Sequence, residues 1–102
     1  MLEIKPNCEC CDGDLPPHST AAMICSYECT FCQSCVDDVL KNVCPNCGGG
    51  FQHRPMRPQV ARRDGVGLEF QPASTVRVQA KHEVPAMTVF AAAHAHIPHD
   101  ER

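Results

Sequence analysis

The sequence predicts a small α+β domain that is stabilised by metal ions and followed by an extended or disordered C-terminal tail. The chain has 102 residues, enough for one small domain. All nine cysteines lie between Cys8 and Cys47. Aromatic residues make up 5% of the chain and Trp is absent. Burial alone therefore cannot stabilise a fold of about 50 residues, and domains of this kind need disulfides or metal.

The N-terminal sequence and the hydropathy favour metal over disulfides. Residues 1–8 lack a basic stretch followed by an apolar run, so we expect no signal peptide. No segment approaches about 18 apolar residues, so we expect no membrane span and no membrane partner. We therefore expect a cytoplasmic protein. In that reducing compartment, clustered cysteines bind metal more often than they form disulfides.

Changes in composition divide the chain into three parts. Residues 1–50 form the cysteine module, residues 51–67 an Arg- and Pro-rich linker, and residues 68–102 a tail that is expected to be flexible or weakly β. The module contains two lysines against seven acidic residues, a net charge of −5, whereas residues 51–102 contain seven cations against five acids. The prolines and glycines of the linker discourage helix and central strand.

Within the module, the pattern predicts one short β-hairpin and one helix. Residues 20–25 read as a strand that enters a turn, and Thr30 begins the return strand. Apolar residues then follow the i, i+3, i+4, i+7 spacing of one helical face: Val36, Val39, Leu40 and Val43. We therefore expect a helix over residues 34–43. In the tail, residues 74–79 alternate like a strand, and residues 86–93 form a short apolar run. The two segments could pair as a hairpin, but an isolated hairpin is marginal in water.

Eight of the nine cysteines have the spacing of paired metal ligands. Without Cys10, the order is Cys8-x2-Cys11-x13-Cys25-x3-Cys29-x2-Cys32-x2-Cys35-x8-Cys44-x2-Cys47. Zinc takes four thiolates in a tetrahedron, and two cysteines in a tight turn supply half a site. The sequence therefore predicts two Zn²⁺ ions in closed, structural four-cysteine sites, because a catalytic zinc keeps an open position. The spacing alone permits several pairings.

The segment from Glu28 to Cys35, followed by a helix and Cys44-Pro45-Asn46-Cys47, resembles a RING finger. The resemblance implies a RING-like or treble-clef fold in which the first and third ligand pairs share one zinc and the second and fourth share the other. Site one would then consist of Cys8, Cys11, Cys32 and Cys35. Site two would consist of Cys25, Cys29, Cys44 and Cys47.

A longer similarity covers residues 1 to about 58. The motifs that carry it are Asn7-Cys8, Asp14-Leu15-Pro16-Pro17, Met23-Ile24-Cys25, Glu28-Cys29-Thr30-Phe31-Cys32, Cys44-Pro45-Asn46-Cys47-Gly48-Gly49-Gly50 and Arg54-Pro55. They are similar to a family of short bacterial cysteine-rich proteins of unknown function. This resemblance implies the metal-binding module but no activity, and the tail beyond about residue 60 lies outside it.

The remaining candidate ligands are one cysteine and several histidines. We interpret Cys10 as a free thiol beside site one rather than as a reactive or alternative ligand, because Glu9 disfavours a thiolate. His18 and His53 lie near cysteine ligands in sequence, but eight well-spaced cysteines make them unnecessary. The histidine-rich end is interpreted as a solvated terminus rather than as a loose metal site: His94, His96, His99 and Asp100.

The function that these patterns favour is a non-catalytic zinc module that contacts another protein, with Ile24, Phe31, Pro45 and the exposed side of the helix as candidate contacts. The alternative is a nucleic-acid-binding zinc finger, although an acidic module repels phosphate. That function would use the arginines of the linker: Arg54, Arg57, Arg62 and Arg63. A RING-type ubiquitin ligase and a redox-responsive zinc switch are less favoured.

Overall fold

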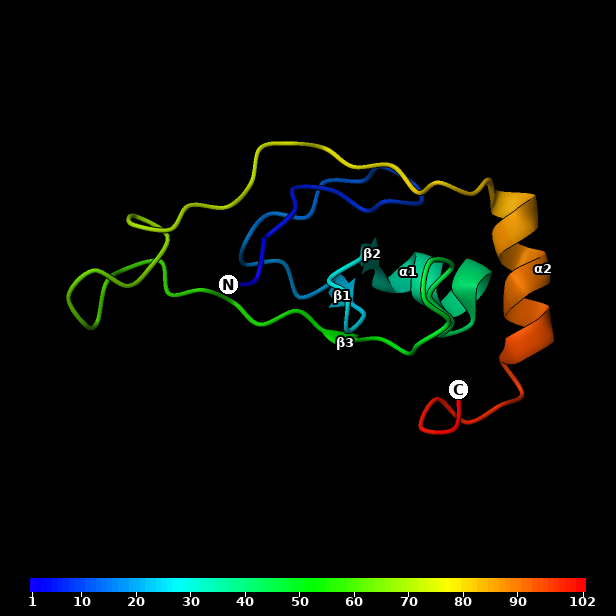
Figure 1. Ribbon diagram of the computed structural model, residues 1–102. Coiled ribbons are helices and arrows are strands. Elements are labelled where there is room, and N and C mark those ends of the chain that lie inside the picture. Colours follow the sequence, from blue (N-terminus) through cyan, green and yellow to red (C-terminus); the bar gives the residue numbers. More distant parts are fainter.

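A small antiparallel sheet in the order β2-β1-β3 forms the centre of the computed structural model, which describes residues 1–102 (Figure 1). β1 (Ala22–Ile24) pairs with β2 (Thr30–Cys32), which confirms the predicted hairpin. β3 (Gln52–His53) pairs with the other edge of β1. The segment expected to be linker thus begins inside the sheet.

The helix of the module follows β2 directly and is made of two helical pieces. α1 (Gln33–Cys35) continues into η1 (Val36–Leu40), which has the wide turn of a π-helix. The helix ends before the predicted residue 43 because Lys41 and Asn42 have φ values of 50° and 60°. A left-handed residue of this kind ends many helices, and Asn adopts it more readily than most residues.

The core lies between the hairpin and this helix and is built from a few apolar side chains. Phe31 and Phe51 pack edge to face, with ring centroids 5.5 Å apart. The arrangement buries Phe51, which anchors the strand that follows it. The other buried aliphatic side chains of the module are Ile4, Leu15, Met23, Val36, Leu40 and Val43. Such a core is small, so the cysteine clusters described below must contribute much of the stability.

Residues 72–80 cross back over the N-terminal segment as an extended strap, drawn in yellow beside the blue chain in Figure 1. The buried side chain of Asn7 accepts a hydrogen bond from the Val78 N–H (3.1 Å) and donates to the Val78 carbonyl (2.8 Å). The Arg77 guanidinium contacts Asp12 (3.0 Å) and Asp14 (2.8 Å). Backbone hydrogen bonds from Ser74 to Ile4 (2.9 Å) and from Ala80 to Glu9 (2.7 Å) fix its two ends, so side chains and backbone together hold the strap.

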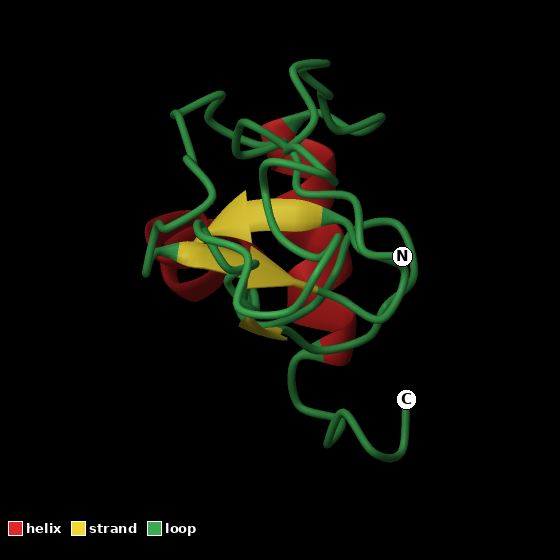
Figure 2. Ribbon diagram, turned by 90° about the vertical axis from the view of Figure 1, so that its left-hand side faces the viewer, coloured by secondary structure: helices red, strands yellow, loops and turns green.

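The structure places a helix, α2 (Val84–His94), where the sequence analysis expected a flexible or weakly β tail. Pro85 stands in the first turn, where its missing N–H costs no hydrogen bond. Met87 and Ala91 are buried, and α2 packs against η1. Figure 2, viewed along the long axis of the molecule, shows α2 behind the sheet. The helix therefore forms because the module buries one of its faces.

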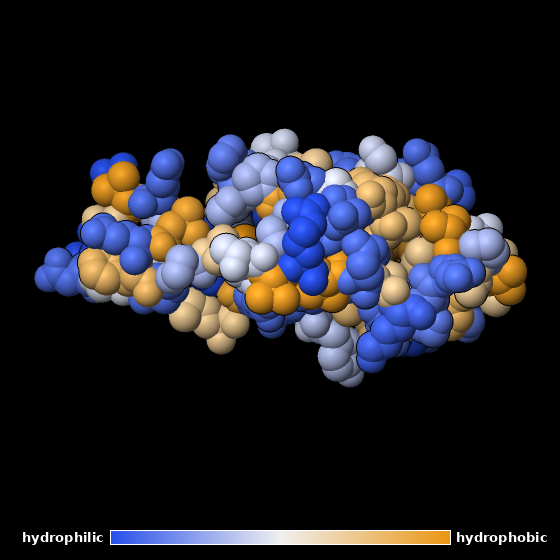
Figure 3. Space-filling model, turned by 90° about the horizontal axis from the view of Figure 1, so that it is seen from above, coloured by the Kyte–Doolittle hydropathy of each residue, from blue (hydrophilic) through white to orange (hydrophobic).

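Residues 58–71 form a loop that projects from the end of the molecule opposite α2 (Figure 1). Gly67, with φ 146°, lets the chain approach Pro58, whose carbonyl accepts the Leu68 N–H (2.9 Å). The loop exposes about half of the surface of Val60, Val66 and Phe70. Figure 3 shows apolar atoms among the hydrophilic ones at this end.

Candidate metal centres

Site one is formed by an N-terminal turn and by the junction of β2 with α1. The sulfur atoms of its four cysteines lie within 4.8 Å of one another: Cys8, Cys11, Cys32 and Cys35. The Cys11 and Cys32 sulfurs are 3.8 Å apart. Two thiolates in a zinc tetrahedron with bonds of about 2.3 Å are also about 3.8 Å apart, so the geometry fits the ion.

Site two joins the hairpin loop to the turn that follows the helix. The sulfur atoms of Cys25, Cys44 and Cys47 lie within 4.8 Å of one another. The fourth residue implied by the RING resemblance, Cys29, stands outside this group. Its sulfur accepts a hydrogen bond (3.4 Å) from the side-chain amide of Asn46, which lies between Cys44 and Cys47 in the sequence. The structure thus gathers three of the four implied ligands and places the fourth beside them.

Backbone N–H groups point at the sulfurs of both clusters. Cys10 and Cys11 donate to the Cys8 sulfur (3.4 and 3.5 Å). Similar donors serve three other sulfurs: Gly13 to Cys11 (3.4 Å), Tyr27 to Cys25 (3.3 Å) and Gly49 to Cys47 (3.4 Å). These donors stabilise the charged thiolate. The tight turns at both clusters therefore bring N–H donors close to sulfurs, where they can stabilise thiolates.

The buried cysteines are poor thiolates in the absence of a cation. Burial raises the pKa of Cys8 to about 11. Burial also raises the pKa of Cys35 and Cys44 well above the ordinary thiol value. By contrast, the Gly13 N–H lowers the pKa of Cys11. The arrangement suits a cation with high thiolate affinity, which displaces the protons on binding.

Glu9 connects the N-terminal turn of site one to the hairpin and is a residue that the sequence analysis did not identify as structural. Its carboxylate is buried, accepts the Thr30 N–H (2.5 Å) and pairs with the Lys5 ammonium (3.1 Å). Its own backbone N–H donates to the Thr30 carbonyl (2.9 Å). No sequence motif distinguishes this buried glutamate from an exposed one.

The linker arginines fold back onto the module, but their partners are carbonyl oxygens rather than sulfurs. The buried guanidinium of Arg54 donates to the carbonyls of Lys5 (2.9 Å), Leu15 (3.2 Å) and Pro16 (3.0 Å). Arg57 donates to the carbonyls of Leu2 and Gln71 (both 2.6 Å). These two arginines therefore stabilise the N-terminal segment and the base of the projecting loop.

The histidines do not join either cluster, since each group of three or more metal-ligating side chains consists of cysteines. His18 and His53 are exposed. His99 lies 3.3 Å from the Asn42 amide.

No helix combines the length and the hydropathy that a membrane span requires.

Comparisons with known proteins agree with the resemblance that the cysteine motifs suggested. Residues 1–57 match the model of a family described as "Protein of unknown function (DUF1272)". An uncharacterized protein of Rhizobium meliloti (strain 1021) is 54% identical over 78 residues, which cover 76% of this chain and 86% of that protein. The similarity thus extends into the second half of the chain. No solved structure matches the chain.

Proposed function

The chain belongs to the DUF1272 family of unknown function, and we propose that its first half is a structural zinc-binding module that presents a surface to another protein. The observation that carries this proposal is the gathering of cysteine sulfurs into two clusters on one small hairpin and helix. Only thiols are gathered at either cluster, and four thiolates in a tetrahedron favour zinc. A closed four-thiolate site binds no substrate, so its role is to hold the fold.

The pairing of the clusters supports a RING-like cross-brace. Site one joins the first cysteine pair of the chain to the third, and in site two one member of the second pair, Cys25, lies with both members of the fourth. In this proposal Cys29 completes site two. Its sulfur already accepts a hydrogen bond from the side chain of Asn46, which lies between Cys44 and Cys47 in the sequence.

The surface offered to a partner lies on the loop between the two hairpin cysteines of site two. Tyr27 is 77% exposed at this position, and its N–H donates to the Cys25 sulfur. The side chain borders a cavity of about 450 Å³ that is also lined by Phe51, His99 and Arg102. An exposed Tyr on a loop that metal makes rigid suits protein recognition, because little conformational entropy is lost on binding.

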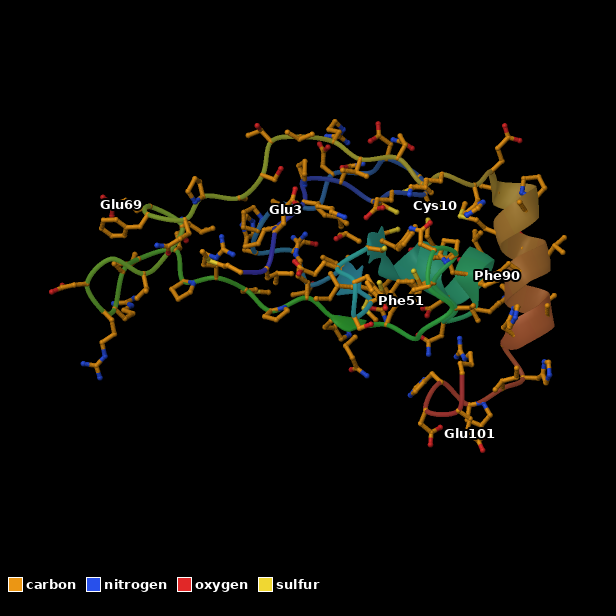
Figure 4. All side chains as sticks on the ribbon, in the orientation of Figure 1. Glu3, Cys10, Phe51, Glu69, Phe90 and Glu101 are labelled. Atoms are coloured by element: carbon orange, nitrogen blue, oxygen red, sulfur yellow. The ribbon has the colours of Figure 1, made fainter.

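The structure moves the partner surface away from two of the contacts that the sequence analysis suggested. Phe31 is completely buried. Pro45 is also buried and lines a hollow together with Ala86, Met87 and Phe90 of α2. Figure 4 shows Phe90 pointing from α2 toward the module. α2 therefore covers the face beside Pro45 and closes it to a partner.

Nucleic-acid binding receives less support than protein binding. Arg54 and Arg57 are engaged with backbone carbonyls, so only Arg62 and Arg63 of the linker are exposed. The same loop contains Asp64 and Glu69, which cancel the charge of these two arginines. A loop without net positive charge attracts phosphate weakly.

Native mass spectrometry tests the metal part of the proposal. We expect two zinc ions per chain, and we expect chelation to abolish the far-ultraviolet circular dichroism of the module, because structural zinc contributes folding free energy directly. A single ion, or a folded form without metal, would contradict it.

Photo-crosslinking tests the interaction surface. A photoreactive amino acid at position 27 is expected to capture a discrete bacterial protein, whereas the same group at position 63, on the projecting loop, is expected to capture none. Equal capture at both positions, or capture at position 63 alone, would show that the Tyr27 surface is not the interface.

A further inference from the structure

The turn that carries Cys8 and Cys11 ends in a peptide group that is held on both sides. Asp12 has a left-handed backbone (φ 63°), and its N–H donates to the Cys8 carbonyl (2.9 Å). The peptide between Asp12 and Gly13 directs its N–H at the Cys11 sulfur (3.4 Å). The carbonyl of the same peptide accepts a hydrogen bond from the Arg77 guanidinium (2.5 Å). Arg77 is thus connected to the Cys11 sulfur through a single peptide group.

The turn that carries Cys44 and Cys47 repeats this arrangement. Gly48 occupies the left-handed position (φ 79°), and its N–H donates to the Cys44 carbonyl (2.8 Å). The peptide between Gly48 and Gly49 directs its N–H at the Cys47 sulfur (3.4 Å). The carbonyl of that peptide accepts a hydrogen bond from the Arg102 guanidinium (3.0 Å). The same chain of contacts, from an arginine through one peptide to a sulfur, therefore occurs at both clusters.

Both arginines lie in the second half of the chain, beyond the residues that match the family model. Arg77 belongs to the strap and also pairs with the Asp14 carboxylate (2.8 Å). Arg102 belongs to the C-terminal segment and also donates to the carbonyls of Asn42 (3.1 Å) and Ile97 (3.0 Å). Figure 1 shows the strap in yellow along one side of the module and the C-terminal segment in red on the other. Each arginine therefore contacts its own turn.

The sulfurs at the ends of these contacts are the less protected ones. Cys11 and Cys47 are exposed, whereas the first cysteine of each turn, Cys8 or Cys44, is buried. Four thiolates around one Zn²⁺ leave an excess of negative charge, which N–H donors stabilise. A cation at the carbonyl polarises the peptide and strengthens the hydrogen bond from its N–H, because hydrogen bonds in a chain reinforce one another. The arginines are thus placed to stabilise the thiolates that solvent and competing chelators reach most easily.

We propose that Arg77 and Arg102 are positioning residues for the metal sites, and that each retains zinc at its own cluster by fixing and polarising the peptide that donates to the exposed cysteine. This inference rests on the proposed zinc module and deepens it, because it assigns a role to the second half of the chain. Retention of the ion at site one then depends on the strap, and retention at site two depends on the C-terminal segment.

Zinc release from the full chain, resolved by site, tests the proposal. The zinc-loaded protein is mixed with an excess of a chromophoric chelator and samples are alkylated at intervals. Tandem mass spectrometry then follows the buried ligands Cys8 and Cys44, which react only after the ion has left. Arg77→Gln is expected to speed release at site one about five- to tenfold and to leave site two within about twofold of the wild type, because charge-assisted hydrogen bonds are lost at one turn only. Arg102→Gln is expected to show the reverse selectivity.

Two further variants serve as controls. Arg63→Gln, on the projecting loop, is expected to change neither rate. Arg77→Lys retains the charge but lacks the planar fork, so a rate between those of the wild type and Arg77→Gln is expected. Equal acceleration at both sites would show that the arginine only stabilises the fold, and unchanged release at both sites would show that its contact has no effect. Either result would overturn the proposal. Fewer than two ions on the untreated wild type would instead overturn the zinc module, so the two failures are distinguishable.

The amide proton chemical shifts of Gly13 and Gly49 test the polarisation directly. In the zinc-loaded protein, Arg77→Gln is expected to move the Gly13 resonance upfield and to leave the Gly49 resonance in place, because the N–H···S hydrogen bond at one turn weakens. Arg102→Gln is expected to move the Gly49 resonance alone. Resonances that stay in place in both variants would contradict the connection from arginine to sulfur.

Discussion

Arg54 lies near the end of the family-matching segment and holds the N-terminal segment in place through hydrogen bonds. The effect of its replacement by Met on the free energy of unfolding can be estimated from the structure. The side chain is 4% exposed and donates to three carbonyls. Met retains the apolar stem but leaves these acceptors without the guanidinium. The bond to Leu15 lies in buried surroundings, whereas the carbonyls of Lys5 and Pro16 can regain water.

The cost is estimated from the acceptors that remain unsatisfied. A buried acceptor without a partner costs about 1–3 kcal/mol, and a hydrogen bond from a charged donor contributes about 1.5–3 kcal/mol. With partial replacement by water at Lys5 and Pro16, we expect Arg54→Met to lower the free energy of unfolding by about 3 kcal/mol. Arg54→Lys retains the charge but lacks the planar fork, so about half of that loss is expected.

Urea unfolding at fixed free zinc concentration, followed by circular dichroism, measures this change, because bound metal shifts apparent stability by mass action. Arg63→Met, on the exposed loop, is the control and is expected to change the free energy of unfolding by less than about 0.5 kcal/mol. If Arg54→Met falls within that range as well, the anchoring role assigned to Arg54 is refuted.

Three further predictions concern pH, the strap and α2. Zinc affinity is expected to rise more than about tenfold per pH unit between pH 6 and 8, because burial raises the pKa of Cys8 and zinc must displace its proton. Calorimetry in buffers of different ionisation enthalpy counts the protons released, and a pH-independent affinity would contradict the prediction. Asn7→Ala is expected to loosen the middle of the strap, since both hydrogen bonds to Val78 are lost. Hydrogen exchange of the Val78 amide should accelerate, and unchanged exchange there would refute the anchor. Met87→Ala removes a side chain that is 2% exposed and is expected to weaken the docking of α2 by about 2–5 kcal/mol. On heating, the variant should lose helical circular dichroism at a temperature at which the wild type retains it, and full retention would show that α2 does not depend on this contact.

Local patterns in the sequence were sufficient for the hairpin, the short helix and the family resemblance. The hairpin follows from strand-like residues on either side of a turn, and these interactions are close in sequence. The helix begins one residue before its expected start, and two of the four residues expected on its apolar face, Val36 and Leu40, are buried within it. Its earlier end was not foreseen, because the left-handed conformation of Lys41 and Asn42 depends on the contacts of the following segment.

The second half of the chain illustrates what pattern alone does not supply. Residues 84–94 are apolar on every side, so no amphipathic period distinguishes a helix from a short strand there. The module decides the matter by burying Met87 and Ala91. The linker arginines left a basic arm for nucleic acid open as the alternative, but two of them donate to carbonyls that lie up to 55 residues away in sequence.

The spacing of the cysteines by itself predicted thiol clusters that could hold metal, because paired thiols in tight turns are a local property. Only the tertiary structure decided which pairs meet, since site one unites residues 21 or more positions apart and their approach depends on packing of the hairpin against the N-terminal turn. The structure also placed Cys29 outside the three-cysteine group of site two. Sequence spacing specifies how far apart two ligands are along the chain, whereas the folded backbone specifies how far apart they are in space.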